Sequence, residues 1–152
     1  MSAFQSRLRP FSPISLRAVA GLALVRDDRV LLVRKSGTDR FVLPGGSTRA
    51  GESTSLSVIH DVADELGVPV TSYDFDLLGI YAAPSVTQPG TLVEATIYAA
   101  ALDEADLWVP QGDLDAARWE PLDSEAEDLS PLVRHHVLPA LLEMVGEVEH
   151  QR

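Results

Sequence analysis

The sequence contains no cysteine. Disulfides, thiolate metal sites and cysteine nucleophiles are therefore excluded, and a reducing cytoplasm is the expected setting. No stretch approaches the run of about 18 apolar residues that a membrane-spanning helix needs. Near the N-terminus, Arg7, Arg9, Pro10 and Pro13 interrupt any apolar run, which argues against a secretory signal. We therefore expect a cytoplasmic protein with no membrane partner.

Lysine is also scarce, because Lys35 is the only one beside eleven arginines, and the charges are unevenly distributed. Residues 1–50 carry nine basic and three acidic side chains, whereas residues 51–152 carry three arginines and twenty acids. The formal charges of the two halves, +6 and −17, give the net charge of −11. So acidic a chain is a poor candidate for non-specific nucleic-acid binding. It suits a protein whose carboxylates hold divalent cations while a basic surface receives an anionic ligand, although most of the acids are expected only to maintain solubility.

What the sequence does contain fits one domain. The 152 residues are 45% hydrophobic, show no repeat or low-complexity stretch, and are enough to bury a core. We expect residues 1–16 to form an N-terminal extension and residues 17–152 to form a single domain. Nothing in the sequence fixes the oligomeric state, so a homodimer stays open.

Apolar runs bounded by turn residues predict the secondary structure. Strands are expected over residues 17–25, 30–33, 77–83, 92–102 and 117–120, with Asp27-Asp28 as a turn and a short apolar run over 41–43. Helices are expected over 53–66 and from Ser130-Pro131 to about Val145, and Pro139 should kink or split the second one. Gly67 stands where a helix often ends in a left-handed residue. Strands interleaved with two helices predict an α/β fold, a mixed β-sheet sandwiched between helices.

The predicted helix over 53–66 separates apolar from acidic side chains. Its apolar side should hold Leu56, Ile59, Val62, Ala63 and Leu66. Asp61, Asp64 and Glu65 fall within an arc of about 100° on the other side. Carboxylates this close repel one another, and a divalent cation with its preference for oxygen ligands would relieve the repulsion. The helix pattern alone, however, favours an ordinary solvated face.

The flanking residues change that interpretation. Leu43-Pro44-Gly45-Gly46 and then Gly51-Glu52 precede the helix and bring backbone close to a metal or phosphate site. Together with the helix they resemble the Nudix box, the loop-helix-loop signature of the Nudix hydrolase family (MutT-like). Six positions fit the signature outright: Gly46, Glu52, Val62, Glu65, Gly67 and Val68. Asp61 and Asp64 stand where the family has glutamate, and His60 stands where it has arginine. The resemblance covers residues 17–122.

The resemblance implies a Nudix fold and a hydrolase acting on acid anhydrides. Such pyrophosphohydrolases cleave nucleoside diphosphates linked to another moiety, through water attack at phosphorus, with Mg²⁺ or Mn²⁺ as the cofactor. The substrate could be a nucleoside triphosphate, an ADP-ribose-like compound or a dinucleotide. Pro84 follows Val68 by sixteen positions, a spacing similar to that in ADP-ribose-cleaving members.

The resemblance also implies roles for individual residues. The metal ligands would be Asp61, Asp64, Glu65 and a carbonyl of Gly45 or Gly46. Glu52 and His60 would form a structural clamp between loop and helix. The general base would be Asp61 within the box or Asp113 in a later loop, and Glu65 would act with it at the catalytic centre. Substrate phosphates would meet one or more of Arg34, Lys35, Arg40 and Arg49.

The departures from the signature leave a second interpretation open. Each Glu-to-Asp replacement retracts a carboxylate by about 1.5 Å, roughly one methylene, and Mg²⁺ demands a compact shell. Histidine lacks the permanent charge and bidentate geometry of arginine, so the clamp between His60 and Glu52 should be weaker and pH-sensitive. Either the enzyme works with an adjusted metal shell, or the chain is a catalytically silent Nudix-fold module that binds nucleotides.

Three further residues carry expectations outside the box. His135 and His136 have no spaced partner that suggests a metal site, and we expect both to be exposed to solvent. Trp119, at the end of a predicted strand, is expected to belong to the core.

Overall fold

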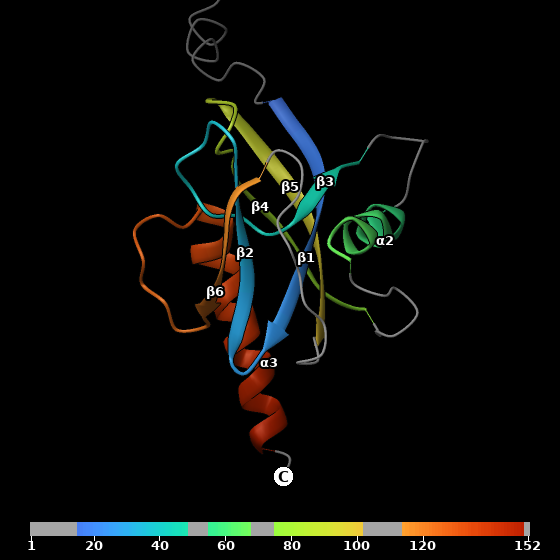
Figure 1. Cartoon of the computed structure of the whole chain (residues 1–152), viewed down its shortest axis with the longest axis vertical. Coiled ribbons are helices and arrows are strands. Elements are labelled where there is room, and N and C mark those ends of the chain that lie inside the picture. Colours follow the sequence, from blue (N-terminus) through green and yellow to red (C-terminus); the bar gives the residue numbers. More distant parts are fainter. Residues whose placement is uncertain (1–14, 49–54, 68–74, 102–113, 151–152) are drawn as a thin grey trace, which may run out of the picture.

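The computed structural model describes residues 15–48, 55–67, 75–101 and 114–150. Within these ranges six strands form one sheet with the order β4-β5-β1-β2-β6, and β3 pairs with β1 off this path. The strands are β1 (Ser15–Arg26), β2 (Arg29–Lys35), β3 (Gly45–Ser47), β4 (Asp76–Pro84), β5 (Thr91–Ala101) and β6 (Leu114–Pro121). Helix α2 (Ser55–Glu65) covers one face of the sheet and α3 (Leu138–His150) covers the other (Figure 1). The predicted mixed sheet between helices is confirmed.

The centre of the sheet is a parallel pair. β1 runs parallel to β5 over eleven consecutive residue pairs, whereas its contacts with β2 and β3 are antiparallel. Side chains of β1 alternate between the two cores: Leu22 and Leu24 pack toward α2, and Ala23 packs toward α3. Because β1 is covered on both faces, it reads as an almost unbroken apolar run in the sequence.

The predicted turn between the first two strands is confirmed. Asp27 and Asp28 have φ angles of 51° and 59°, and Val25 lies opposite Val30 across the hairpin. Two left-handed central residues define the turn whose twist matches antiparallel strands, and aspartate tolerates that conformation better than most residues.

Strand β3 lies between β1 and α2, and glycine makes both approaches possible. A Cβ atom on Gly45 would stand 2.3 Å from the carbonyl oxygen of Ala20, so no other residue fits there without displacing β3. A Cβ atom on Gly46 would stand 3.2 Å from Cγ1 of Val58 in α2. The backbone of β3 is therefore held against the central strand and the helix at once.

Helix α2 ends as predicted but buries a different residue near its start. Gly67 has φ = 74° and donates its N–H to the carbonyl of Asp64 at 3.0 Å, which confirms the left-handed C-terminal position. The prediction that Leu56 belongs to the apolar face is wrong, because Leu56 is 40% exposed whereas Val58 is 8% exposed. Val58 is buried because it meets the bare backbone of Gly46, a tertiary contact that helical periodicity does not encode.

The terminal helix is interrupted where Pro139 was expected to disturb it. A π-helical segment, η2 (Val133–Val137), precedes α3, and the N–H of Leu138 donates to the carbonyl of Val133, five residues back. In a regular α-helix the ring of Pro139 would crowd the carbonyl four residues earlier, and proline has no N–H to donate. The wider turn just before it places Pro139 in the first turn of α3, where neither problem arises. The helix extends further than predicted, to His150.

The expectation for the histidine pair is half wrong. His135 is exposed, but His136 is partly buried and stacks on Tyr81, with ring centroids 5.3 Å apart. Packing of the helix against β4 removes His136 from solvent, which the local sequence did not reveal. Trp119 packs, partly buried, against the core on the α2 side, with the Arg26 guanidinium 5.3 Å from its ring centroid.

None of the helices in the described ranges is long and apolar enough to cross a membrane.

Candidate active site

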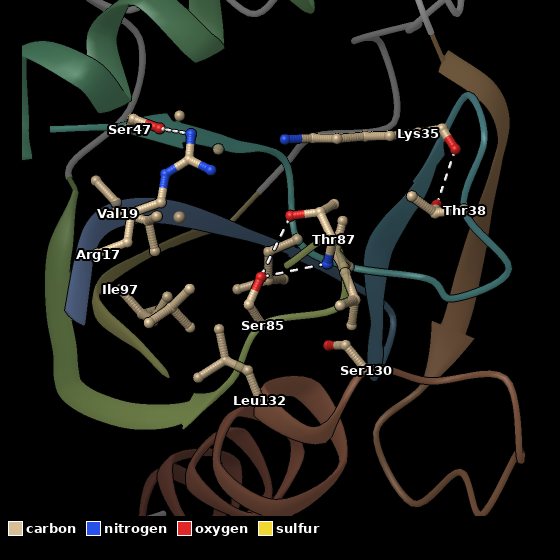
Figure 2. Close-up of a pocket in the computed structure, with 18 of the residues that line it drawn as sticks. Arg17, Val19, Lys35, Thr38, Ser47, Ser85, Thr87, Ile97, Ser130 and Leu132 are labelled. Carbon is tan, nitrogen blue, oxygen red and sulfur yellow. Dashed lines mark hydrogen bonds between the residues drawn. The ribbon is translucent and has the colours of Figure 1, made fainter. Parts of the chain in front are cut away.

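A pocket of about 140 Å³ opens beside β3, on the side of the sheet that carries α3. It is bounded by β1, β3 and β5, by the loop that follows β4, by the end of β2, and by Ser130 and Leu132 at the entrance to the terminal helix (Figure 2). Its apolar walls include Val19, Val42, Leu43, Val93, Ile97 and Leu132. Four stretches of the sequence therefore meet around one cavity: 17–21, 35–47, 84–97 and 130–132.

Two cations border the pocket. Figure 2 shows Lys35 extending across the pocket toward the guanidinium of Arg17, which lies beside Ser47. Arg17 donates a hydrogen bond to Oγ of Ser47, which fixes its direction along β3. In the described part of the chain, no acidic or aromatic side chain lines the pocket. The cavity is therefore electrostatically suited to an anionic ligand.

Hydroxyl groups on the pocket wall have well-defined partners. Oγ of Ser85 accepts hydrogen bonds from the backbone N–H groups of Thr87 and Gln88, each at 3.2 Å, and lies 3.2 Å from Oγ1 of Thr87. Ser130 is 3% exposed, and its Oγ accepts the N–H of Val133 at 3.2 Å as the cap of the terminal helix. The hydroxyls thus hold the loop after β4 and the start of the helix in place around the pocket.

The predicted backbone ligands Gly45 and Gly46 form β3 and line the pocket. The N–H of Leu22 donates to the carbonyl of Pro44, and the N–H of Thr48 donates to the carbonyl of Ala18. Bonded positions alternate along an antiparallel pair, so Gly46 faces β1 with its hydrogen-bonding groups and the carbonyl of Gly45 points away from β1. Of the two predicted carbonyls, that of Gly45 is the one oriented for a ligand.

The three predicted acidic ligands share one exposed side of α2. Asp61, Asp64 and Glu65 are all exposed, whereas Val58, Ile59, Val62 and Ala63 of the same helix are buried. In the residues that the structure describes, no group of three acidic, histidine or cysteine side chains stands close enough to hold a metal ion. The donor set still fits Mg²⁺ or Mn²⁺ by chemistry, because carboxylates at positions i, i+3 and i+4 of one helix offer the hard oxygen ligands that these ions prefer.

The remaining predicted residues lie in several places. Lys35 lines the pocket, whereas Arg34 lies over the Phe41 ring, 5.9 Å from its centroid, and is not among the residues that line it. His60 makes an edge-to-face contact with Phe75, with centroids 5.4 Å apart. The predicted residues Arg49, Glu52 and Asp113 fall outside the described residues, as do Ser53 and Thr54 at the expected start of the helix.

A charged cluster is connected to the pocket residue Ser130 through backbone hydrogen bonds. Arg118 donates to both carboxylate oxygens of Asp128, at 2.8 and 2.6 Å, and to Glu120, and its guanidinium lies 4.0 Å from the centroid of the Phe41 ring. These hydrogen bonds lower the pKa of Asp128 below its ordinary value. The carbonyl of Asp128 accepts the N–H of Phe41, whose own carbonyl accepts the N–H of Ser130. The cluster thereby positions Ser130 at the pocket.

Sequence reasoning missed the pocket residues Arg17, Ser47, Thr87 and Ser130 as a group. One signal was present, because Arg17 is a lone charge at the start of a long apolar run. The others needed the topology, since strand β3, the loop after β4 and the entrance to the terminal helix contribute one residue each.

Comparisons with known proteins agree with this architecture. The profile of the NUDIX domain matches residues 15–141, so the chain belongs to the Nudix family. The resemblance predicted from the box is thereby confirmed. A segment of 53 residues is 40% identical to an uncharacterized Nudix hydrolase, YvcI, of Bacillus subtilis, and it spans 35% of this chain and 34% of that protein.

Solved structures share the fold over most of their length. A MutT NUDIX hydrolase from Burkholderia pseudomallei is 25% identical with a TM-score of 0.62, and the match covers 86% of this chain and 98% of that one. An Ap4A hydrolase from C. elegans, solved as a binary complex, is 14% identical with a TM-score of 0.68 and the same two coverages. At that lower identity the second likeness concerns the fold alone.

Proposed function

We propose that this protein is a metal-dependent hydrolase that cleaves a phosphoanhydride bond in a small nucleoside diphosphate derivative. The observation that carries the proposal is the position of β3. Gly46 meets Val58 of the acidic helix and also lines the pocket, so β3 is shared by both. A site for an anionic moiety and a helix of exposed carboxylates are therefore joined through three residues of backbone.

Asp61, Asp64, Glu65 and the carbonyl of Gly45 would hold the metal. When bound, Mg²⁺ or Mn²⁺ would neutralise charge on the diphosphate and make the attacking water more acidic. Arg17 and Lys35 would attract and orient the phosphate oxygens. The water oxygen forms a bond to phosphorus, the bridging P–O bond breaks, and a carboxylate accepts the water proton. Asp61 and Asp113 are the two candidates for that carboxylate.

A hydrolysis screen tests this function. Nucleoside triphosphates, ADP-ribose and dinucleoside polyphosphates should be incubated with Mg²⁺ and with Mn²⁺, and the phosphate-bearing products should be separated by chromatography. We expect Glu65→Gln, which keeps size but removes charge, to lower turnover by at least roughly 10- to 100-fold, the loss typical of weaker outer-sphere changes. Glu125→Gln, at an exposed position between β6 and the terminal helix, is the matched control. Activity of Glu65→Gln within a few-fold of wild type at saturating metal would remove Glu65 from the site.

A second candidate function is a catalytically silent module that binds nucleotides. Two observations favour it. Within the described ranges no three acidic, histidine or cysteine side chains stand close enough to hold a metal ion, and Asp61 and Asp64 are shorter than the glutamates of the family signature. Nucleotides that bind tightly yet stay intact with every metal in the screen would establish this second function.

A further inference from the structure

The size of the pocket limits what it can receive. Its volume of about 140 Å³ is close to that of an apolar cavity of about 150 Å³, which accommodates benzene. The floor is tightly packed, because a Cβ atom at Gly21 would stand 2.9 Å from Cδ1 of Ile97, which is fully buried. The space therefore fits one six-membered ring, whereas a purine has two fused rings.

The hydroxyl network determines which polar groups the ring should carry. A hydroxyl oxygen has two lone pairs and one hydrogen. Both lone pairs of Ser85 are used by the N–H groups of Thr87 and Gln88, so Ser85 must donate its hydrogen to Oγ1 of Thr87. The hydroxyl hydrogen of Thr87 is then left to donate elsewhere.

The hydroxyl hydrogen of Ser130 is also left to donate to a ligand. Its oxygen accepts the N–H of Val133. Within the described residues, the hydroxyl hydrogen of Ser130 has no hydrogen-bond acceptor. Arg17 and Lys35 add N–H groups, and no carboxylate of the described residues lines the pocket. The N–H groups of the two cations and the two hydroxyl hydrogens outnumber the single lone pair left on each hydroxyl oxygen. This balance favours acceptor oxygens over exocyclic amino groups.

We propose that the pocket selects a phosphate-bearing moiety with a single ring and acceptor oxygens, and discriminates against purines. This inference rests on the proposed function, in which the pocket holds one moiety of a diphosphate. Thr87 and Ser130 are the specificity-determining residues, and Arg17 and Lys35 bind the attached phosphate. A pyrimidine base with carbonyl oxygens and a sugar ring both supply this chemistry.

Binding of monophosphates to the full chain without metal tests the inference. Dissociation constants should be measured by calorimetry for uridine 5′-monophosphate, glucose 1-phosphate and adenosine 5′-monophosphate. We expect at least one of the first two to bind ten or more times more tightly than the third. Tight binding of the uridine compound assigns the pocket to a pyrimidine base, and tight binding of the glucose compound assigns it to a sugar. Equal or tighter binding of the adenosine compound, or no binding of any of the three, overturns the inference.

Two variants test the residues. Thr87→Val removes the donor at an exposed position, and should weaken the preferred compound roughly three- to tenfold, the value of one hydrogen bond. Thr96→Val is its control, because Thr96 shares the α2 side of β5 with Tyr98 and Ala100. Leu132→Ala enlarges the pocket and should improve adenosine binding relative to the single-ring compounds. Leu78→Ala, a partly buried leucine of the same core that does not line the pocket, should not. Unchanged affinities in Thr87→Val and Leu132→Ala would remove both residues from the specificity site.

The two proposals fail separately. Metal-dependent hydrolysis that proceeds equally well on purine and single-ring derivatives would leave the proposed function in place and overturn the ring selection. Selective binding of single-ring monophosphates without hydrolysis of any derivative would leave the ring selection in place and overturn the proposed function.

Discussion

Asp61 and Asp64 reach about one methylene less far from α2 than glutamates would, so a compact octahedral shell is harder to assemble around Mg²⁺. Mn²⁺ differs from Mg²⁺ in its affinity for nitrogen and oxygen ligands, and it accepts a looser coordination geometry. The side chains therefore bear directly on the choice of metal.

We predict that Mn²⁺ supports hydrolysis better than Mg²⁺. Restoring the longer acids in the double variant Asp61→Glu, Asp64→Glu should narrow the difference, because the carboxylates then reach a compact shell. The measurement is kcat at saturating concentrations of each metal. A native protein that works faster with Mg²⁺ would contradict this account of the two aspartates.

Asp128 carries a second prediction at this scale. Its folded pKa is lowered, first by the hydrogen bond from Arg118, so its contribution to stability is present at neutral pH and is lost as the pH falls through that lowered value. Asp128→Asn should destabilise the fold at pH 7 by roughly 1 kcal/mol, between the values for exposed and buried charged pairs, since the Asp128 side chain is 44% exposed. The Tm difference from wild type should shrink as the pH drops below the ordinary value of 3.8. A difference that stays constant through that pH range would contradict the pair's role.

Individual residues also show where sequence patterns stop being informative. Gly67 and the Asp27-Asp28 turn were predictable because their conformations follow from local chemistry. The burial of Val58 in place of Leu56, and the stacking of His136 on Tyr81, depend on which surfaces meet after the chain has folded. The direction of the Gly45 carbonyl follows only from the register of β3 against β1.

Among the elements, β3 is the one on which the proposed site depends most. It has only three residues, and Gly45 approaches β1 more closely than any side chain permits. Sequence patterns predicted the long strands and both helices, whereas the strand order and the pairing of so short a strand could not be read from periodicity.

Two glycine-to-alanine variants should have opposite effects. Gly45→Ala forces β3 away from β1, and we expect it to destabilise the fold by about 1–3 kcal/mol or more, as overpacking does, and to abolish activity. Gly146→Ala, in α3 with open space around it, should stabilise the protein by up to about 1 kcal/mol through helix propensity. Both are measured by urea unfolding. A Gly45→Ala protein of wild-type stability would show that β3 tolerates displacement.

At the scale of the whole molecule, the excess of acids in the second part of the chain links metal binding to global stability. Three exposed carboxylates of α2 repel one another in the metal-free protein, and a ligand that binds only the folded state stabilises it by mass action. Metal binding at α2 should therefore raise the free energy of unfolding of the whole domain.

We predict that Mn²⁺ at about 100 times its dissociation constant stabilises the fold by about 2.7 kcal/mol. For a domain of this size that corresponds to a rise in Tm of roughly 5–10 °C. Glu65→Gln should lose most of the rise and Glu125→Gln should keep it, as measured by thermal scans with and without chelator. An unchanged Tm at saturating Mn²⁺ would argue against a metal site on the folded chain.

The parallel pairing of β1 with β5 also has a kinetic consequence. Ser15 lies opposite Thr91, 76 positions further along the chain, so the central contact of the sheet closes a very long loop. On the ribosome, β1 is synthesised well before β5. Until β5 is made, the apolar side chains of β1 that belong to the two cores lack their main partner strand. Non-local pairings of this kind slow folding and leave apolar surface open to other chains in the meantime. The strand that organises the finished molecule is thus the one most dependent on prompt completion of synthesis.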